Sequence, residues 1–282
     1  MQKGKLYIVA TPIGNLDDMS KRAIDTLNNV DIIIAEDTRT SGQLLKHFDI
    51  KTNAESYHKF NEIDKSKQVI KYLLEGKNIA LISDAGTPGI SDPGNVIVKE
   101  CIENKIDIVP IPGACAFIQA LICSGFDTIN FSFFGFLPVE KKERKLVLEK
   151  IQNATTNLVV LYESPHKLLK TLNDLKEELG NCELSISREI TKMYEEHLKF
   201  TIDEAIDHYT NKEPKGEFVL VIKKETKKEI EASLDDKTTQ ENITKEYTKL
   251  KKDFNLKEIS NMLSEEYKIN KKEIYTFLAK IK

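Results

Sequence analysis

The feature that most constrains the fold of this chain is a series of short apolar runs that alternate with helical patterns. Strands are predicted at residues 6–10 (LYIVA), 31–37 (DIIIAED), 79–83 (IALIS) and 106–111 (IDIVPI), because few of their residues are polar. Strands that are apolar on both faces and alternate with helices are typical of a parallel sheet covered on both sides. The sequence therefore predicts an α/β domain at residues 1–112.

A second block of secondary structure is predicted after residue 112, with strands that follow one another more closely. Its expected strands lie at residues 131–138, 157–163, 182–190, 197–202 and 217–222, and its expected helices at 117–124, 139–151 and 168–179. This spacing favours a mixed sheet, so we expect a second α/β domain at residues 113–223.

The last part of the chain is predicted to be a linker followed by a small helical appendix. Residues 224–240 are polar with few large apolar side chains, which is typical of a linker. In residues 241–282, two groups of apolar residues at helical spacing predict two amphipathic helices in a helix-turn-helix-like appendix. The groups are Leu256, Ile259 and Leu263, and Ile274, Leu278 and Ile281.

Charge is unevenly distributed along the chain. From Lys223 onward there are 15 lysines and 12 acidic residues, whereas the preceding residues carry a net charge of −6. A basic tail suits an acidic partner, although a solvated helical face would give the same small surplus. Only four arginines stand against 38 lysines, so they are candidates for sites that need a planar, bidentate donor. They are Arg22, Arg39, Arg144 and Arg188.

Composition argues against several classes of protein. With 282 residues, 40% hydrophobic and 31% charged, the chain resembles ordinary globular proteins. No apolar run approaches the roughly 18 residues that a membrane-spanning helix requires, and the first residues lack the layout of a signal peptide. The four cysteines have no Cys-x-x-Cys spacing, so we expect reduced thiols in a cytoplasmic protein, without a metal site.

Three polar clusters directly follow predicted buried strands: TPIGN (11–15), EDTRT (36–40) and SDAGTPGISDPG (83–94). Ligands of open α/β sheets bind at the carboxyl ends of the strands, so we expect the clusters to form one site. In the third cluster, glycines permit close backbone approach to a ligand, and Asp84 and Asp92 supply acceptors. The alternative is an elaborate turn in which Ser91 or Asp92 caps the next helix.

The charged residues at two predicted strand ends also admit two interpretations. Asp37 and Arg39 are either functional or part of a helix N-terminus that Thr38 or Thr40 caps.

Glu163, in ESPHK, is either functional or paired with Arg188 or Lys192 in SREITKMYEEH. Such a pair would be a structural ion pair between adjacent strands.

Taken in order, several segments resemble the tetrapyrrole-methylase superfamily of S-adenosylmethionine-dependent methyltransferases, and within it the 16S ribosomal RNA cytidine 2′-O-methyltransferase family. They are VATPIGNLDDMSKRA, AEDTRTSG, SYHKFNE, LISDAGTPGISDPG, IPGACA, FFGFLP, YESPHK, SREITKMYEE and GEFVLVI. The chain departs from the family at Ala114 and Cys115, where proline and serine are usual, and at Lys167, where arginine is common. The resemblance implies two α/β domains with a cleft between them, S-adenosylmethionine as cofactor, and a homodimer.

The resemblance also implies which residues form the site. The expected cofactor-binding residues are Pro12, Ile13, Asp84, Gly86, Thr87, Pro88, Ala114, Cys115, Ala116, Tyr162 and Glu217. The expected catalytic residues are Asp37, Arg39, Glu163, Arg188 and Lys192. A carboxylate would accept the proton of a ribose 2′-hydroxyl, and the basic side chains would hold neighbouring phosphates.

The expected partner is 16S ribosomal RNA, within the small ribosomal subunit. Two alternatives remain at this point: a small-molecule methylase of the same fold that acts on a tetrapyrrole, and a noncatalytic RNA-binding assembly factor.

Overall fold

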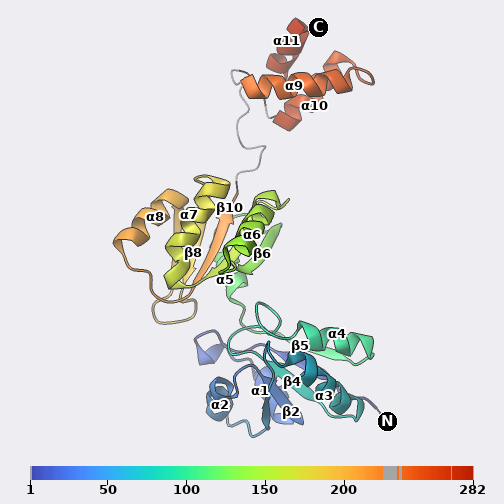
Figure 1. Ribbon diagram of the computed structural model, residues 1–282, viewed down its shortest axis with the longest axis vertical. Helices are drawn as coiled ribbons and strands as arrows, with labels where there is room; N and C mark the ends of the chain where they lie inside the picture. Colours follow the sequence, from blue (N-terminus) through green and yellow to red (C-terminus); the bar gives the residue numbers. More distant parts are fainter. Residues whose placement is uncertain (1, 225–233, 235–236, 268, 282) are drawn as a thin grey trace. The chain divides into compact units, whose positions relative to one another are not determined.

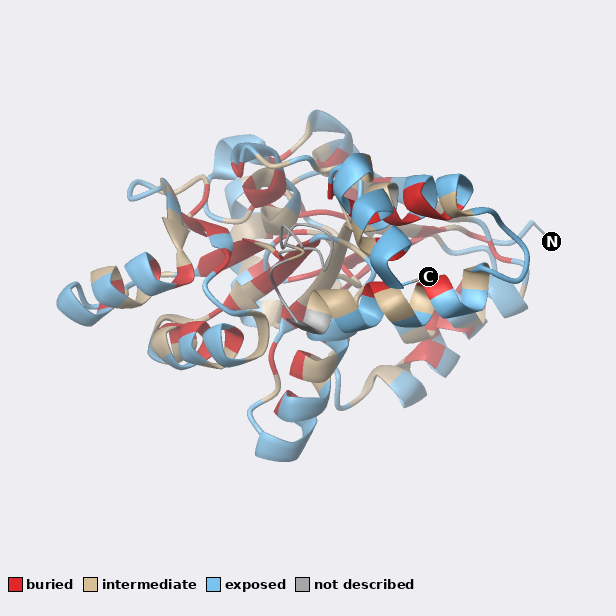
Figure 2. Ribbon diagram, turned by 90° about the horizontal axis from the view of Figure 1, so that it is seen from above, coloured by how far each residue is buried: buried red, intermediate tan, exposed pale blue. Residues whose placement is uncertain are grey.

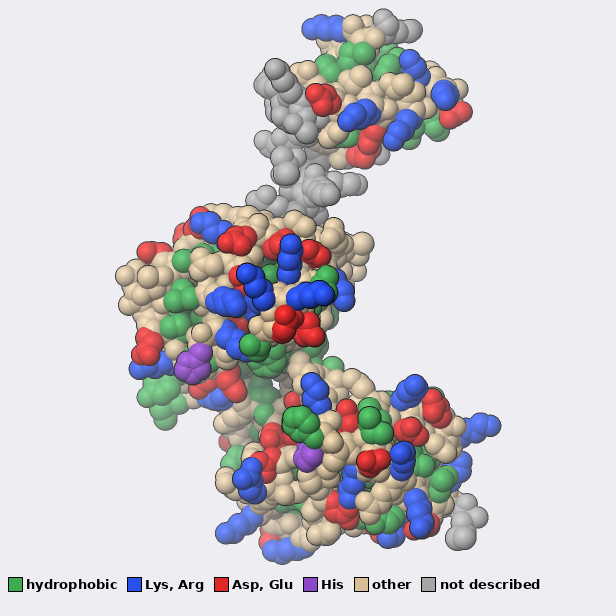
Figure 3. Space-filling model, viewed as in Figure 1, with side chains coloured by type: hydrophobic (Ala, Val, Ile, Leu, Met, Phe, Trp, Pro, Cys, Tyr) green, Lys and Arg blue, Asp and Glu red, His purple; other side chains and the backbone are tan. Residues whose placement is uncertain are grey.

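The computed structural model describes residues 2–224, 234, 237–267 and 269–281 (Figure 1). The chain divides into two compact units, Met1–Lys223 and Lys224–Lys282. In the described parts of the chain, no helix has both the length and the apolar character needed to cross a membrane. Acidic and basic side chains are intermixed on the face of the molecule that Figure 3 presents.

The first sheet is fully parallel, with strand order β3-β2-β4-β1-β5. Its strands are β1 (Leu6–Val9), β2 (Ile32–Ala35), β3 (Ala54–Ser56), β4 (Ile79–Ile82) and β5 (Ile108–Ile111). The parallel sheet expected from the apolar runs is thus confirmed. The sequence prediction missed β3, because this short strand is half-buried and has no run of apolar residues.

Helices cover both faces of this sheet, because successive strand residues point to opposite sides. They are α1 (Lys21–Asn29), α2 (Thr38–His47), α3 (Glu62–Leu74) and α4 (Asn95–Glu103), with a short 3-10 helix η1 (Leu16–Asp18). Ile34 belongs to a core cluster with α3 and α4, whereas its neighbour Ile33 belongs to a cluster with α1 and α2. Figure 2 shows buried residues along the strands and exposed residues on outer helix faces.

The second sheet is mixed, with strand order β6-β7-β10-β8-β9 and one parallel pair, β6 with β7. Its strands are β6 (Phe131–Phe136), β7 (Leu158–Glu163), β8 (Glu183–Arg188), β9 (Glu196–Thr201) and β10 (Phe218–Lys223). Its helices are α5 (Ala116–Cys123), α6 (Lys141–Asn153), α7 (Leu168–Leu179) and α8 (Ile202–Asn211), with a 3-10 helix η2 (Pro165–Lys167). The helices α6, α7 and α8 share one core cluster, and α5 packs on the opposite face.

Helix α8 was predicted only through His208, which was expected on a helix surface, and its bounds were missed although its beginning carries a clear signal. Thr201 and Glu204 form a capping box, in which each side chain binds the backbone of the other residue.

The C-terminal unit contains three helices in its described residues, where the sequence predicted two. They are α9 (Lys237–Leu250), α10 (Leu256–Tyr267) and α11 (Lys271–Ile281). Ile243 and Tyr247 of α9 pack with Ile259, Leu263 and Ile274 in one small core. Helix α9 therefore begins inside the expected linker, most of which lies outside the described residues. Its apolar residues were overlooked because polar residues surround them.

Candidate functional site

Three loops meet at the carboxyl edge of the first sheet. Thr11 and Gly86 form a two-way backbone bridge, with N···O distances of 2.9 and 3.0 Å. The Thr87 hydroxyl donates to the carbonyl of Ala114 at 3.0 Å. The structure therefore brings together the 11–15, 83–94 and 113–116 segments, although they are distant in the sequence.

The loop after β4 owes its path to glycines with backbone conformations that other residues rarely adopt. Gly86 has a φ of +85°, and a Cβ atom there would lie 3.3 Å from the Ile13 side chain. Gly94 has a φ of +148° and is itself the N-cap of α4, without a side-chain cap. The interpretation of this segment as a turn in which Ser91 or Asp92 caps α4 is therefore wrong.

A cavity of about 560 Å³ opens between these loops and the second sheet. Eight of the eleven expected cofactor-binding residues line it: Ile13, Asp84, Gly86, Thr87, Cys115, Ala116, Tyr162 and Glu217. The expected catalytic residue Glu163 lines it as well. Pro12, Pro88 and Ala114 are not among its lining residues, and Ala114 instead supplies the carbonyl that holds Thr87.

Three carboxyl groups from the first half of the chain face this cavity: Glu36, Asp84 and Asp92. Burial, together with Glu36 and Asp84, raises the pKa of Asp92 to about 7. Burial and Asp84 also raise the pKa of Glu36. Neighbouring carboxylates in a confined space disfavour one another's ionisation, so this side of the cavity favours a cationic ligand. The sequence analysis did not select Glu36 as a site residue.

An apolar wall formed by the second sheet and by the turn after β8 completes the cavity. Phe136, Tyr162, Ile190 and Val219 contribute to it. The Tyr162 hydroxyl accepts a hydrogen bond from the Phe117 amide at 3.3 Å. Burial raises the pKa of Tyr162 and of the Cys115 thiol, so both side chains are neutral near pH 7. A cavity with one acidic side and one apolar side suits a ligand that is part cationic and part aromatic.

Asp37 and Arg39 lie beside the cavity and bind each other. Asp37 is the N-cap of α2 and accepts from the Arg39 amide at 2.8 Å, so the expectation that Thr38 or Thr40 caps the helix is wrong. The guanidinium group of Arg39 also donates to both carboxylate oxygens of Asp37, at 3.1 and 2.7 Å. These bonds lower the pKa of Asp37 to about 2, which makes it a poor proton acceptor.

Glu163 belongs to a buried polar network that joins β7 to two helices. Its side chain, in a residue only 2% exposed, accepts from the Thr171 hydroxyl at 2.5 Å and from the Ser164 amide at 2.7 Å. The Thr171 oxygen in turn accepts from the guanidinium of Arg144 at 2.7 Å. Arg144 also donates to Asp174 at 2.6 Å. The only sequence feature that pointed to this network is Arg144, one of four arginines in a chain with 38 lysines.

The expected pairing of Glu163 with Arg188 or Lys192 is wrong. Strand β10 lies between β7 and β8, so the two segments are not adjacent in the sheet. Arg188 pairs instead with Glu196 at 2.8 Å. Lys192 bridges Glu189 and Glu217, with N···O distances of 2.9 Å to each.

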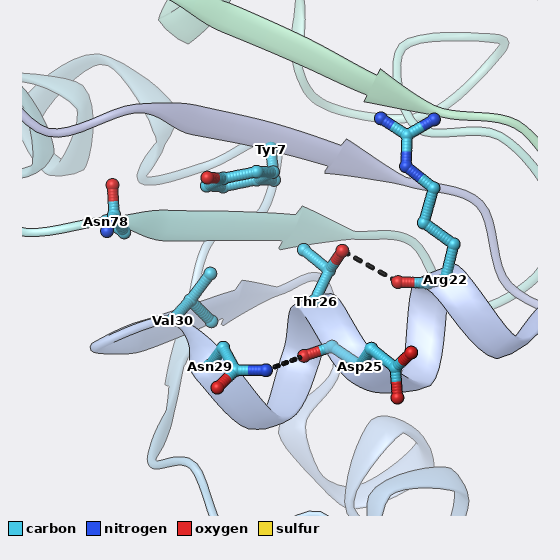
Figure 4. Close-up of a pocket in the computed structure, with 7 residues that line it drawn as sticks. All are labelled: Tyr7, Arg22, Asp25, Thr26, Asn29, Val30 and Asn78. Atoms are coloured by element: carbon cyan, nitrogen blue, oxygen red, sulfur yellow. Dashed lines mark hydrogen bonds between the residues drawn. The ribbon is translucent and has the colours of Figure 1, made fainter.

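A smaller hollow of about 230 Å³ lies beside α1, away from all the expected site residues (Figure 4). Two of its polar side chains bond within the helix, Thr26 to the carbonyl of Arg22 at 2.7 Å and Asn29 to that of Asp25 at 2.6 Å. These groups are therefore already satisfied, and the larger cavity remains the candidate site.

Comparison with known proteins places the fold among the methylases. The family model of Tetrapyrrole (Corrin/Porphyrin) Methylases matches residues 5–206. A crystal structure of diphthine synthase superposes with a TM-score of 0.63 at 13% identity, covering 79% of this chain and 91% of that one. Uroporphyrin-III-C-methyltransferase from Thermus thermophilus superposes with a TM-score of 0.53 at 16% identity, covering 78% and 94%. Fold and cavity thus define a methylase of the S-adenosylmethionine-dependent class.

Proteins with similar sequences show which family of methylases the chain belongs to. A protein of Synechocystis sp. is 44% identical over 274 residues, which cover 96% of each chain. One of Halalkalibacterium halodurans is 50% identical over 220 residues, covering 78% of this chain and 76% of the relative. One of Haemophilus influenzae is 42% identical over 278 residues, covering 97% and 96%. All three are named ribosomal RNA small subunit methyltransferase I, and the chain belongs to their family.

The buried network around Glu163 should stabilise the fold through the Thr171 hydroxyl. Thr171→Val is expected to lower the free energy of unfolding by roughly 3 kcal/mol, because it removes the hydrogen-bond partner of the Glu163 Oε2 atom and of the Arg144 Nη2 atom. Thr171→Ser keeps the hydroxyl and should lose much less. Urea unfolding followed by circular dichroism measures both, and equal losses in the two variants would contradict the role of the hydroxyl.

The raised pKa of Asp92 predicts a dependence of stability on pH. Because this pKa is higher in the folded state than the ordinary value of 3.8, the folded protein binds more protons between about pH 4 and 7. Asp92 therefore lowers the free energy of unfolding as the pH rises through this window. Asp92→Asn should be more stable than the wild type at pH 8, with a difference that shrinks toward pH 4.

Urea unfolding at intervals from pH 4.5 to 8 tests this expectation, with Asp127→Asn, at an exposed carboxylate, as the control. A constant difference between Asp92→Asn and the wild type across that range would show that Asp92 does not titrate as expected.

Proposed function

We propose that this protein transfers a methyl group from S-adenosylmethionine to the 2′-hydroxyl of a cytidine ribose in 16S ribosomal RNA. The cavity carries this proposal, because it offers an acidic side, an apolar wall and one oriented carboxylate at the same place. The relatives that share nearly the whole length of the chain support an RNA of the small ribosomal subunit as substrate. Methyl transfer from labelled donor to small ribosomal subunits, followed by nuclease mapping of the product, tests the proposal.

The residues of the cavity fit S-adenosylmethionine. The cofactor carries a sulfonium and an amino group, which suit the side formed by Glu36, Asp84 and Asp92, and an adenine ring, which suits the apolar wall with Tyr162. The glycine-rich loop at Gly86 lets the backbone approach the ligand closely. When bound, the cofactor supplies an electrophilic methyl group.

Glu163 is the carboxylate best placed to accept the proton of the attacking hydroxyl. It lines the cavity, and the bonds from Thr171 and Ser164 fix its orientation. Asp37 is less suitable, because Arg39 stabilises its ionised form. The side chain of Arg39 is 90% exposed and is therefore available to a phosphate of the RNA. Arg188 and Lys192 fix strand ends next to the cavity through their ion pairs.

Variants at these positions should separate turnover from cofactor binding. Glu163→Gln is expected to lower kcat by about 100-fold or more, because it removes the proton acceptor. Arg39→Ala should also depress turnover far more than donor affinity, because the RNA is then held less well in position. Arg22→Ala, at an exposed arginine beside the smaller hollow, is the matched control.

Transfer of tritiated methyl groups to small ribosomal subunits measures turnover, and calorimetry measures donor affinity. Unchanged turnover in both the Glu163 and Arg39 variants would remove these residues from the mechanism.

The C-terminal unit is proposed to contribute to RNA affinity. Residues before Lys223 carry a net negative charge, which opposes RNA binding, whereas the remainder has an excess of lysine. Lysines of the C-terminal unit and of α6 are the expected phosphate contacts. They are Lys249, Lys251, Lys252, Lys271 and Lys272, together with the lysines of residues 141–145.

Truncation after Lys223 follows the division between the two compact units. It should weaken RNA binding and reduce the dependence of affinity on salt, while donor binding persists. Charge reversal at Lys251 and Lys252 in the full chain is the matched variant and should act in the same direction. If filter binding at several salt concentrations gives the wild-type slope for both, the C-terminal unit does not bind RNA.

Two further parts of the proposal concern assembly and location. We propose a homodimer, which the exposed apolar side chains of Ile118 and Ile122 on α5 support. We also propose that the protein acts in the cytoplasm, where ribosomal subunits are found.

Of the two alternative functions, a tetrapyrrole methylase has support only from the family model and from structures of such enzymes that are 16% identical to this chain. A noncatalytic RNA-binding factor would have no need of the oriented carboxylate at Glu163.

A further inference from the structure

The turn between β8 and β9, residues 189–195, has a strained backbone. Glu189 and Thr191 adopt left-handed conformations, with φ of +50° and +68°. Residues other than glycine rarely adopt such angles, and strain of this kind persists where the surrounding structure enforces it, often at functional positions. The turn belongs to the segment SREITKMYEE, in which the proposed function gives a role only to Arg188 and Lys192.

Several bonds hold this turn in one shape. The Thr191 amide donates to the Glu195 carboxylate at 2.6 Å, and the Lys192 amide donates to the Glu189 carbonyl at 2.9 Å. The ammonium group of Lys192 binds both Glu189 and Glu217. A Cβ atom on Gly14 would lie 2.4 Å from the Lys192 side chain, so the turn also packs closely on the loop after β1. The turn is therefore rigid and fixed beside the cavity, which Ile190 lines.

The turn presents two large apolar side chains to solvent. Met193 is 89% exposed and Tyr194 is 67% exposed. Within residues 2–224, neither side chain has a hydrogen bond or a ring contact. A rigid support under two solvent-exposed apolar side chains is typical of a binding surface.

We propose that Tyr194 and Met193 form a platform on which an unpaired base of the RNA stacks, next to the nucleotide that enters the cavity. This inference rests on the proposed function, since it takes RNA as the substrate. Proteins recognise single-stranded RNA by stacking its bases on aromatic side chains, and one such contact contributes roughly a tenfold or greater gain in affinity.

Size and charge favour a base over a protein partner. Two side chains offer the area of one base, far less than the roughly 1,000 Å² that a specific protein interface buries. Cations also lie among the carboxylates around the turn: Glu196 binds Arg188, and Lys192 lies between Glu189 and Glu217. Their positive charge reduces the repulsion that these carboxylates exert on an approaching phosphate backbone.

The test compares Tyr194→Ala with Tyr194→Phe in the full-length protein. Tyr194→Ala should raise the KM for small ribosomal subunits about tenfold, while donor affinity measured by calorimetry stays at the wild-type value. Tyr194→Phe keeps a ring and should retain the wild-type KM. Ile129→Ala, at an apolar side chain that is 82% exposed elsewhere on the surface, is the control. A stacking contact carries no charge, so the slope of affinity against salt should not change.

Two outcomes would overturn the inference: an equal loss in Tyr194→Phe, or a wild-type KM in Tyr194→Ala. If the wild-type KM came with a change of oligomeric state in Tyr194→Ala, the platform would be assigned to contact with a second copy of the chain. Failure of the wild-type protein to methylate the RNA would instead refute the proposed function, so the two failures are distinguishable.

Discussion

The parallel register of three neighbouring strands is the constraint on which the rest of the site depends. Ile82 of β4 pairs with Val9 of β1 on one side and with Ala35 of β2 on the other. Two residues beyond these positions lie Thr11, Asp37 and Asp84, so all three leave the sheet at the same edge. Hydrogen bonds across this edge, from the Asp37 amide to Asp84 at 3.1 Å and from the Thr11 hydroxyl to the carbonyl of Ser83 at 3.1 Å, then join the loops to one another.

This shared edge also brings carboxyl groups close together. Their surroundings shift the pKa values of two adjacent residues in opposite directions. Glu36 and Asp37 are adjacent in the chain, yet the pKa of Glu36 is raised by burial and by Asp84, whereas that of Asp37 is lowered by Arg39. Asp37, next to the guanidinium, is a stable anion, whereas the pKa of Asp92 is about 7, so this carboxyl group can ionise when a cation binds beside it. Binding of a cationic donor would lower the pKa of Asp92 and release protons, which couples occupancy of the cavity to pH.

Helix bounds and the positions of the loops could be predicted from the sequence. Contacts between side chains that are distant in the sequence mostly could not. Helix α7 begins and ends at the predicted residues, 168 and 179, because its apolar positions repeat at helical spacing between clear boundaries. The cavity-lining loops were predicted from their position after apolar strands. The partner of Glu163 was not, because it depends on the insertion of β10 between β7 and β8, a long-range feature without a local signal. Nothing in the sequence around Thr171 indicates that its hydroxyl bonds Glu163 and Arg144, because both partners lie on other elements of the fold.

The chain has 38 lysines and only four arginines, so the contacts of the arginines show what a lysine could not supply. Of the four that remain, three use the planar fork of the guanidinium to reach two acceptors. Arg39 binds both oxygens of Asp37, Arg144 binds Asp174 and Thr171, and Arg188 binds Glu196 and the carbonyl of Lys215. The ammonium group of a lysine is a single point charge and cannot donate two hydrogen bonds in the fixed geometry of the planar guanidinium. Three of the four arginines thus lie where two acceptors match the fork, and Arg39 and Arg144 contact Asp37 and the Glu163 network beside the cavity.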